Sequence, residues 1–155
     1  MKLSDEDKKD IIDSALVLRQ WRNTKNPFKV AKAMGIKIKP LNNNPSMRGY
    51  SYYGEDKKEI WINPNLSYKE KITVCTHELG HIVLNHTGKS YYKDTDLDRE
   101  YCANLFAISF LCLYDGLYKK LYKELYTEYE SREDIINLSN FTIQTILERQ
   151  TAKTN

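Results

Sequence analysis

Apolar residues recur at helical spacing along the first part of the chain. After a capping pair at Ser4 and Asp7, they lie three or four positions apart and predict a helix over residues 5–22. Asparagine followed by proline then opens a second, shorter helix. We expect it over residues 27–34, because Gly35 stands where a C-terminal glycine belongs.

The middle of the chain predicts two longer helices. Ser67 and Glu70 form a complete capping box at the start of a helix over residues 68–86, which contains the stretch TVCTHELGHIVLNH. A further helix is expected over residues 96–114. Tyrosines and leucines then repeat at helical spacing, which favours a packed helix face over an aromatic binding surface, and two short helices follow toward the C-terminus.

Polar and apolar positions alternate between the second helix and the capping box, which is typical of half-buried strands. Residues 36–39 form one such segment, and residues 50–54 and 59–63 form two more, joined by a polar turn. These segments predict a small antiparallel sheet of about three strands. The predicted fold class is therefore α+β and mostly helical.

Length and composition are those of an ordinary globular chain. At 155 residues the chain fits a single domain spanning residues 1–155. Its net charge of +3 permits contact with nucleic acid or an acidic partner but favours neither. Three cysteines cannot all pair, and no signal sequence or membrane-spanning run is evident. We therefore expect a cytoplasmic protein that does not enter a membrane.

The stretch TVCTHELGHIVLNH carries the candidate chemistry. His77 and His81 are four residues apart, so one helix face directs both imidazoles at a point about 2 Å from each, the distance that zinc requires. Glu78 is rotated by about one hundred degrees and lies beside such a metal, where it could accept a proton from water. Gly80 leaves room there for substrate or for a close neighbouring element.

A catalytic zinc needs a third protein ligand. His86 lies about 180 degrees round the helix from His77, which favours a surface or capping role, and packing is favoured for Cys75. The best candidate is Glu100 on the next helix, whose alternative role is an ordinary solvated charge. Asn104, one turn further, could hydrogen-bond the outer nitrogen of a liganding histidine.

These segments together resemble the ImmA/IrrE metallopeptidases of bacteria and mobile genetic elements. NPFKVAKAMGIKIKPL resembles the opening helix and strand of that family, and EIWINPNLSYKEKITVCTHELGHIVLNH resembles the strand that leads into its zinc helix. DREYCANLFA matches its glutamate and asparagine segment. The resemblance covers about residues 25–112, and the Leu-Leu-Met-Pro that usually follows in the family is absent here.

The resemblance implies a small zincin-like fold with a catalytic core over about residues 25–114 and a C-terminal helical extension over about residues 115–150. It implies one zinc ion and a catalytic base at Glu78. The implied metal ligands are His77, His81 and Glu100, with Asn104 behind them. Such a protein would be a zinc-dependent endopeptidase that cleaves a regulatory protein, namely the helix-turn-helix repressor of a phage or mobile element.

Two other classes of function stay open. One is a non-catalytic regulator with the same fold, which binds DNA or a partner protein and holds zinc structurally. The other is a helical interaction module without metal. The C-terminal helices could imitate a DNA-reading motif, but they offer only Arg149 and Gln150 near their end, so direct binding of nucleic acid is not expected.

Two features of a peptidase site stay open in the sequence. An extended substrate is expected to pair with the sheet edge nearest the site, but the pattern does not say whether residues 50–53 or 60–63 form that edge. No oxyanion stabiliser stands out, since a structural role is favoured for each candidate. Those candidates are Tyr50, Tyr52, Tyr53 and His86.

Overall fold

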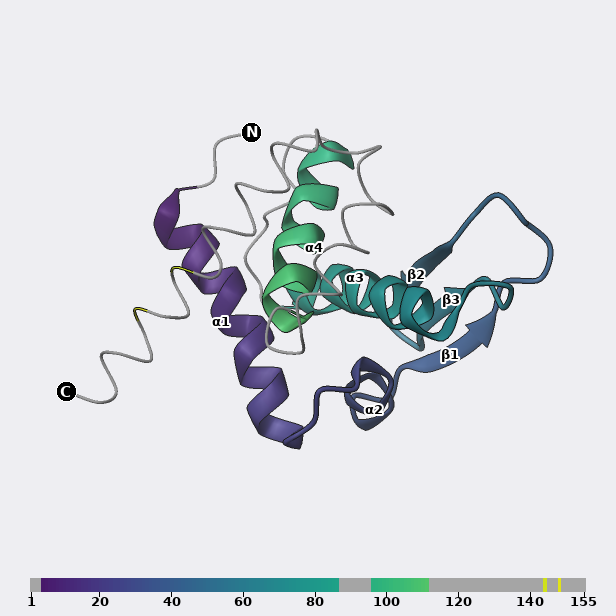
Figure 1. The fold of residues 1–155 in the computed structure, drawn as a ribbon, viewed down its shortest axis with the longest axis horizontal. Helices are drawn as coiled ribbons and strands as arrows, with labels where there is room; N and C mark the ends of the chain where they lie inside the picture. Colours follow the sequence, from purple (N-terminus) through teal and green to yellow (C-terminus); the bar gives the residue numbers. More distant parts are fainter. Residues whose placement is uncertain (1–3, 87–95, 112–143, 145–147, 149–155) are drawn as a thin grey trace.

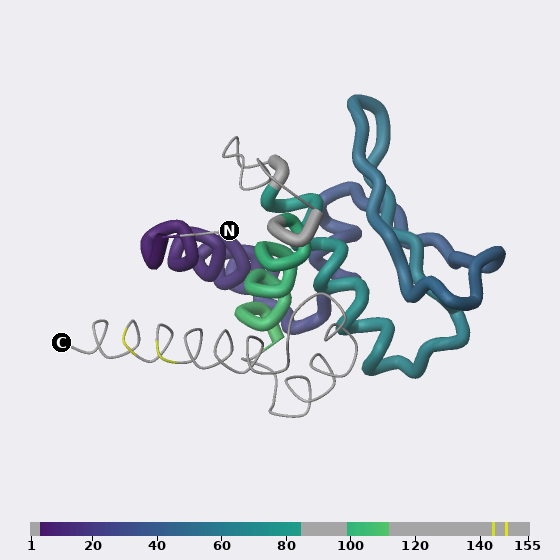
Figure 2. Tube along the Cα trace, turned by 90° about the horizontal axis from the view of Figure 1, so that it is seen from above, coloured from purple at the N-terminus to yellow at the C-terminus, as the bar shows by residue number. Residues whose placement is uncertain are grey.

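The structure is a computed structural model of the 155-residue chain, and it describes residues 4–86 and 96–111 together with residues 144 and 148. The described elements follow in this order: α1 (Asp5–Arg22), α2 (Pro27–Ala33), β1 (Lys37–Pro40), β2 (Gly49–Tyr53), β3 (Lys58–Ile62), α3 (Tyr68–His86) and α4 (Asp96–Leu111). Figures 1 and 2 show α3 in the middle, with the sheet on one side of it and α4 and then α1 on the other. This arrangement is the mostly helical α+β fold that the sequence predicts.

The predicted helix starts are confirmed by their caps. The Ser4 hydroxyl accepts a hydrogen bond from the Asp7 amide at 3.0 Å, and α1 begins at the next residue, Asp5. At the start of α3, the Ser67 hydroxyl accepts from the Glu70 amide and the Glu70 carboxylate accepts from the Ser67 amide, each at 3.2 Å. Each cap satisfies backbone donors that have no partner inside the helix.

The three predicted strands are present, but one of their two pairings differs from the prediction. The strand order is β1-β3-β2, in which β2 and β3 form an antiparallel hairpin and β1 runs parallel to β3. The prediction of a wholly antiparallel sheet is therefore wrong, and the sheet is mixed. Two chain reversals separate β1 from β3, so the two strands run in the same direction once β3 enters the middle of the sheet. Alternation within each strand does not reveal which strands become neighbours.

The core lies on both sides of α3. Ile60 and Ile62 of β3 are buried on the sheet side, and Leu79 of α3 is fully buried. On the other side, α4 brings Phe106 and Phe110 into the core, where their rings lie 6.4 Å apart. Because α3 has neighbours on two sides, polar side chains in its middle, such as those of Thr76 and His77, are withdrawn from water.

Several expectations fall beyond the described residues. The last three residues of the helix predicted over 96–114, the tyrosine and leucine repeat, the two short C-terminal helices and the extension over about 115–150 all lie there. In the part of the chain that the structure describes, no helix is both long enough and apolar enough to cross a membrane.

Candidate metal centre

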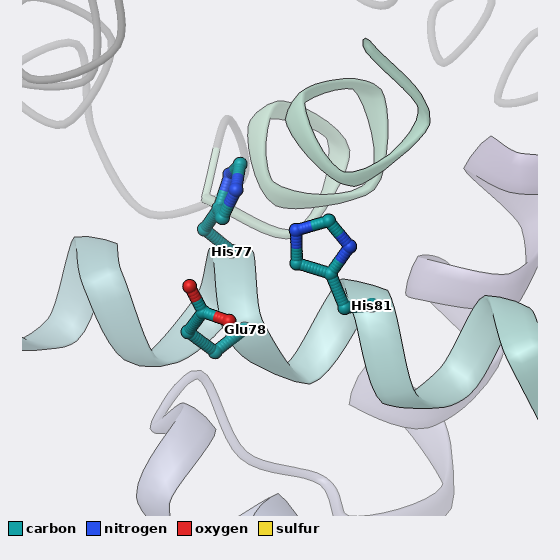
Figure 3. Close-up of side chains that lie close together, drawn as sticks. All are labelled: His77, Glu78 and His81. Carbon is teal, nitrogen blue, oxygen red and sulfur yellow. The ribbon is translucent and has the colours of Figure 1, made fainter. Parts of the chain in front are cut away.

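The two histidines of α3 stand together one turn apart. Their ring centroids are 4.9 Å apart and the rings meet edge to face at 82° (Figure 3). The side chain of His77 is 2% exposed and that of His81 is 16% exposed. The four-residue spacing therefore has the predicted effect, and it places one imidazole in the core and the other at the edge of the solvent-accessible region.

Glu100 of α4 points into this pair rather than outward to solvent. Its Oε2 lies 2.7 Å from Nε2 of His77, and its Oε1 lies 3.2 Å from Nε2 of His81. One carboxylate thus contacts both imidazoles from the neighbouring helix. The alternative in which Glu100 is a solvated surface charge is excluded by these contacts, because its side chain is only 19% exposed.

The distances suit a zinc ion. Zinc lies about 2.0–2.2 Å from nitrogen and oxygen ligands, so two ligand atoms of a tetrahedral site lie roughly 3.3 Å apart. The two nitrogen–oxygen distances, 2.7 and 3.2 Å, are near that value and would need only a small expansion. Two imidazoles and one carboxylate also match the ligand types of catalytic zinc sites, which leave a further position open.

The electrostatics of the three side chains favour a positive charge between them. Burial raises the pKa of the Glu100 carboxyl, but hydrogen bonds from His77 and His81 outweigh this and lower that pKa to about 2. For His81, burial lowers the pKa, and the contacts with Glu100 and Glu78 raise it above the ordinary histidine value. Glu100 is therefore ionised at neutral pH and stabilises a cation at the imidazoles.

Glu78 lies beside the histidine pair. It is 7% exposed, and one carboxylate oxygen lies within 4.8 Å of ring nitrogens of His77 and His81 (Figure 3). Among the described residues, the ligand atoms of these three side chains lie close enough together to contact one metal ion. Glu78 is thus near enough to act on a group held at the histidines, as expected for a residue next to His77 on the helix.

The other residues considered from the sequence take different places. Asn104 is fully buried on α4, one turn from Glu100, and its hydrogen bonding to a histidine stays a prediction. Cys75 is fully buried, and burial, followed by the nearby charge of Glu78, raises the pKa of its thiol. A protonated thiol in the core agrees with the packing role that its helix position indicates. The side chain of His86 lies outside the described residues.

The strand order shows which strand forms the edge of the sheet beside α3. β3 has a partner on each side, whereas β2 pairs with β3 on one side only in the described part of the chain. β2 also packs on α3, since a Cβ added at Gly49 would come within 2.7 Å of Val74 Cγ1. The edge strand next to α3 is therefore β2, and β3 is excluded as that edge.

The candidate oxyanion residues on β2 divide between the two faces of the sheet. Tyr50 stacks on Trp61 at 5.8 Å with the ring planes 9° apart, and Tyr52 lies on the same outer face. Ile60 and Ile62, which alternate with Trp61, face the core instead. Tyr50 and Tyr52 thus lie on the face away from α3, which agrees with the structural role favoured for them.

Two residues with contacts that involve α4 carry no signal of those contacts in the sequence. Arg19 of α1 donates a hydrogen bond to the carbonyl oxygen of Phe110 on α4, and Phe106 of α4 lies against Gly80 of α3. Each contact joins residues far apart in the chain, and although Gly80 indicated a possible close neighbour, nothing in the local pattern marks Arg19 or Phe106 as a contact residue. They hold the helix that carries Glu100.

Comparison with known proteins agrees with this arrangement. Residues 31–147 match the model of the Peptidase M78 family, described as the IrrE N-terminal-like domain. The chain is also 36% identical over 93 residues to "Uncharacterized immunity region protein 2" of Bacillus phage phi105, a match that covers 57% of this chain. The chain spans 59% of that relative's length. No solved structure matches the chain. Because the family model covers well over half of the sequence, the chain belongs to the IrrE/ImmA-like Peptidase M78 family.

Proposed function

We propose that this protein is a zinc-dependent endopeptidase that hydrolyses a peptide bond in a regulatory protein. The observation that supports it most strongly is the contact of Glu100 with both His77 and His81, at 2.7 and 3.2 Å, next to Glu78. It brings two imidazoles and two carboxylates into one place, in a chain of a peptidase family.

In this proposal His77, His81 and Glu100 hold one zinc ion. When bound, zinc would lower the pKa of water toward neutrality and polarise the scissile carbonyl as a Lewis acid. Glu78 accepts the proton of the attacking water and returns it to the leaving amine. Its burial beside the histidines keeps it within reach of that proton. Asn104, buried one turn from Glu100, is proposed to orient a liganding histidine.

The edge of β2 is the proposed docking strand for the substrate. β2 lies along α3, and strand addition at such an edge aligns an extended peptide through its backbone without reading its sequence. We propose a helix-turn-helix repressor of a phage or mobile element as the substrate, met in the cytoplasm. The name of the phage relative, an immunity region protein, supports a setting in which such repressors act.

A substitution of Glu78 by glutamine separates this proposal from a regulator with structural zinc. Glu78→Gln keeps the size and polarity of the side chain but removes the base. We expect hydrolysis of a helix-turn-helix repressor offered as substrate, followed by mass spectrometry, to fall at least about a hundredfold, since general acid–base catalysis contributes 10²–10⁴-fold. Zinc content, measured by elemental analysis, should stay at one equivalent.

Glu70→Gln is the matched control, because it makes the same chemical change in the exposed first turn of the same helix. It should cleave at the normal rate. Biological activity that survives Glu78→Gln would instead favour the non-catalytic regulator, and purified protein without zinc would favour the metal-free interaction module.

A further inference from the structure

Gly80 lies on α3 between the two histidines, and it faces Phe106 of α4. A Cβ added at Gly80 would lie 3.0 Å from Cδ1 of Phe106 and 3.2 Å from both its Cβ and its Cγ. Carbon atoms normally pack at about 3.5–4.0 Å. The room left by this glycine is therefore filled by α4, and it is not open to a substrate.

Phe106 cannot move aside to make that room. It is fully buried, and its ring stacks on that of Phe110 at 6.4 Å and 20°. One of the crowded atoms is its Cβ, whose position is set by the backbone of α4, so no change of rotamer relieves that contact. A side chain at position 80 would have to move the α4 backbone itself.

The same helix carries Glu100, six residues before Phe106, which is about 9 Å along a helix axis. Glu100 reaches the two imidazoles only through short contacts of 2.7 and 3.2 Å. A displacement of α4 by several tenths of an ångström at Phe106 would lengthen these contacts. The separation of α3 and α4 at Gly80 therefore affects how closely the Glu100 carboxylate approaches the two imidazoles.

We propose that Gly80 is a positioning residue, which sets the separation of α3 and α4 so that Glu100 reaches the ion together with His77 and His81. This inference rests on the proposed zinc site. It assigns no chemistry to Gly80, which acts through Phe106 and the backbone of α4. It also gives Gly80 a specific role. The sequence alone left two possibilities for the space beside this glycine, a substrate or a close neighbouring element.

The test is the zinc affinity of Gly80→Ala, measured by competition with a chromophoric chelator, in two backgrounds. In the natural background we expect affinity to fall by about 10- to 100-fold, the range found when groups that orient ligands are removed. In a Glu100→Ala background the same substitution should change affinity by less than about twofold. Coupling of this kind is what a double-mutant cycle isolates.

Helix propensity and one control variant separate this role from general damage to the fold. Alanine is a better helix former than glycine, so helix propensity alone predicts that Gly80→Ala stabilises α3. Gly35→Ala is the control, because Gly35 has φ +76° and, among the described residues, no atom lies within 4 Å of an added Cβ. It strains the backbone between α2 and β1, outside the two helices that carry the site, and should leave zinc affinity within about twofold of the natural protein.

The inference is overturned if Gly80→Ala binds zinc as tightly as the natural protein, or if it loses the same factor in both backgrounds. Neither result would affect the proposed function, which fails separately if the natural protein binds no zinc. If Gly80→Ala does not fold, the contact is tested in a Phe106→Ala protein instead. Phe106→Ala removes two of the three crowded atoms, Cγ and Cδ1. Adding Gly80→Ala to Phe106→Ala should then cost less stability than adding it to the natural protein, because only the contact with the Cβ at position 106 remains, and an equal loss would count against the contact.

Discussion

Arg19 of α1 donates a hydrogen bond from Nη1 to the carbonyl oxygen of Phe110 on α4 at 2.9 Å, and its guanidinium carbon lies 5.7 Å from the centre of the Phe110 ring. α1 precedes residues 31–147, which match the family model. It nevertheless packs on α4 through fully buried side chains that include Ile11 and Ile12. The first helix is therefore part of the frame that holds Glu100 at the histidines.

Arg19→Met should destabilise the protein because it removes both contacts with α4 but keeps most of the apolar length of the side chain. A hydrogen bond from a charged donor contributes about 1.5–3 kcal/mol, so we expect the free energy of unfolding in urea to fall by about 1–2 kcal/mol at this half-buried site. Arg22→Met makes the same change at an exposed position of α1 and should cost less than about 0.5 kcal/mol. Equal losses for the two variants would show that the contact with Phe110 contributes nothing.

Glu100→Ala should weaken zinc binding far more than it weakens the fold. It removes one of three proposed ligands, so we expect affinity to fall by more than about a hundredfold, beyond the 10- to 100-fold effect of groups that only orient ligands. His77→Ala should do the same. Equilibrium competition with a chelator measures both. Glu6→Ala, at the exposed start of α1, serves as the control and should bind one full equivalent at normal affinity. Normal zinc binding by Glu100→Ala would disprove the ligand set.

Glu59 should make the stability of the sheet depend on pH. It is 3% exposed on β3 and forms ion pairs with Lys39 and, at 3.3 Å, with Lys57. The hydrogen bond from Lys39 is the main cause that lowers the pKa of its carboxyl, against the opposing effect of burial. Because folding lowers this pKa, the stabilisation is present above the ordinary glutamate pKa and is lost as the pH falls through the folded value.

We therefore expect the melting temperature of Glu59→Gln to fall less steeply than that of the natural protein between pH 6 and about pH 3. At neutral pH the same variant should melt at a lower temperature, since Lys39 loses its charged partner. Glu55→Gln, in the exposed turn before β3, is the control and should follow the natural profile. Parallel profiles for Glu59→Gln and the natural protein would show that this carboxylate does not couple folding to pH.

Asn63→Ala should loosen the loop that enters β2. The Asn63 amide donates to the carbonyl oxygens of Pro45 and Met47 at 3.3 and 3.2 Å, and its oxygen accepts from the Asn65 amide at 2.9 Å. Removing this 6% exposed side chain breaks three hydrogen bonds to backbone groups of exposed residues, which water can then reach, so we expect a cost of about 0.5–1.5 kcal/mol. Faster hydrogen exchange in residues 45–48 would locate the effect there. Unchanged exchange would contradict it.

Features that depend on neighbours three or four residues away were readable from the sequence. The capping pairs Ser4 with Asp7 and Ser67 with Glu70 marked where α1 and α3 begin, because each closes a hydrogen bond within one turn. The pairing of His77 with His81 was predictable for the same reason, since the helix repeat alone brings positions four apart to one face. Alternation likewise placed the three strands.

Tertiary packing decided the rest. The parallel pairing of β1 with β3 depends on which strand enters the middle of the sheet, and no local pattern encodes that choice. The contact of Glu100 with His77 joins residues 23 positions apart, and it requires α4 to lie at one particular distance from α3. That distance is set by the buried contact between Gly80 and Phe106. The contact depends on how side chains fill the space between two helices, and that space is defined only once the chain is packed.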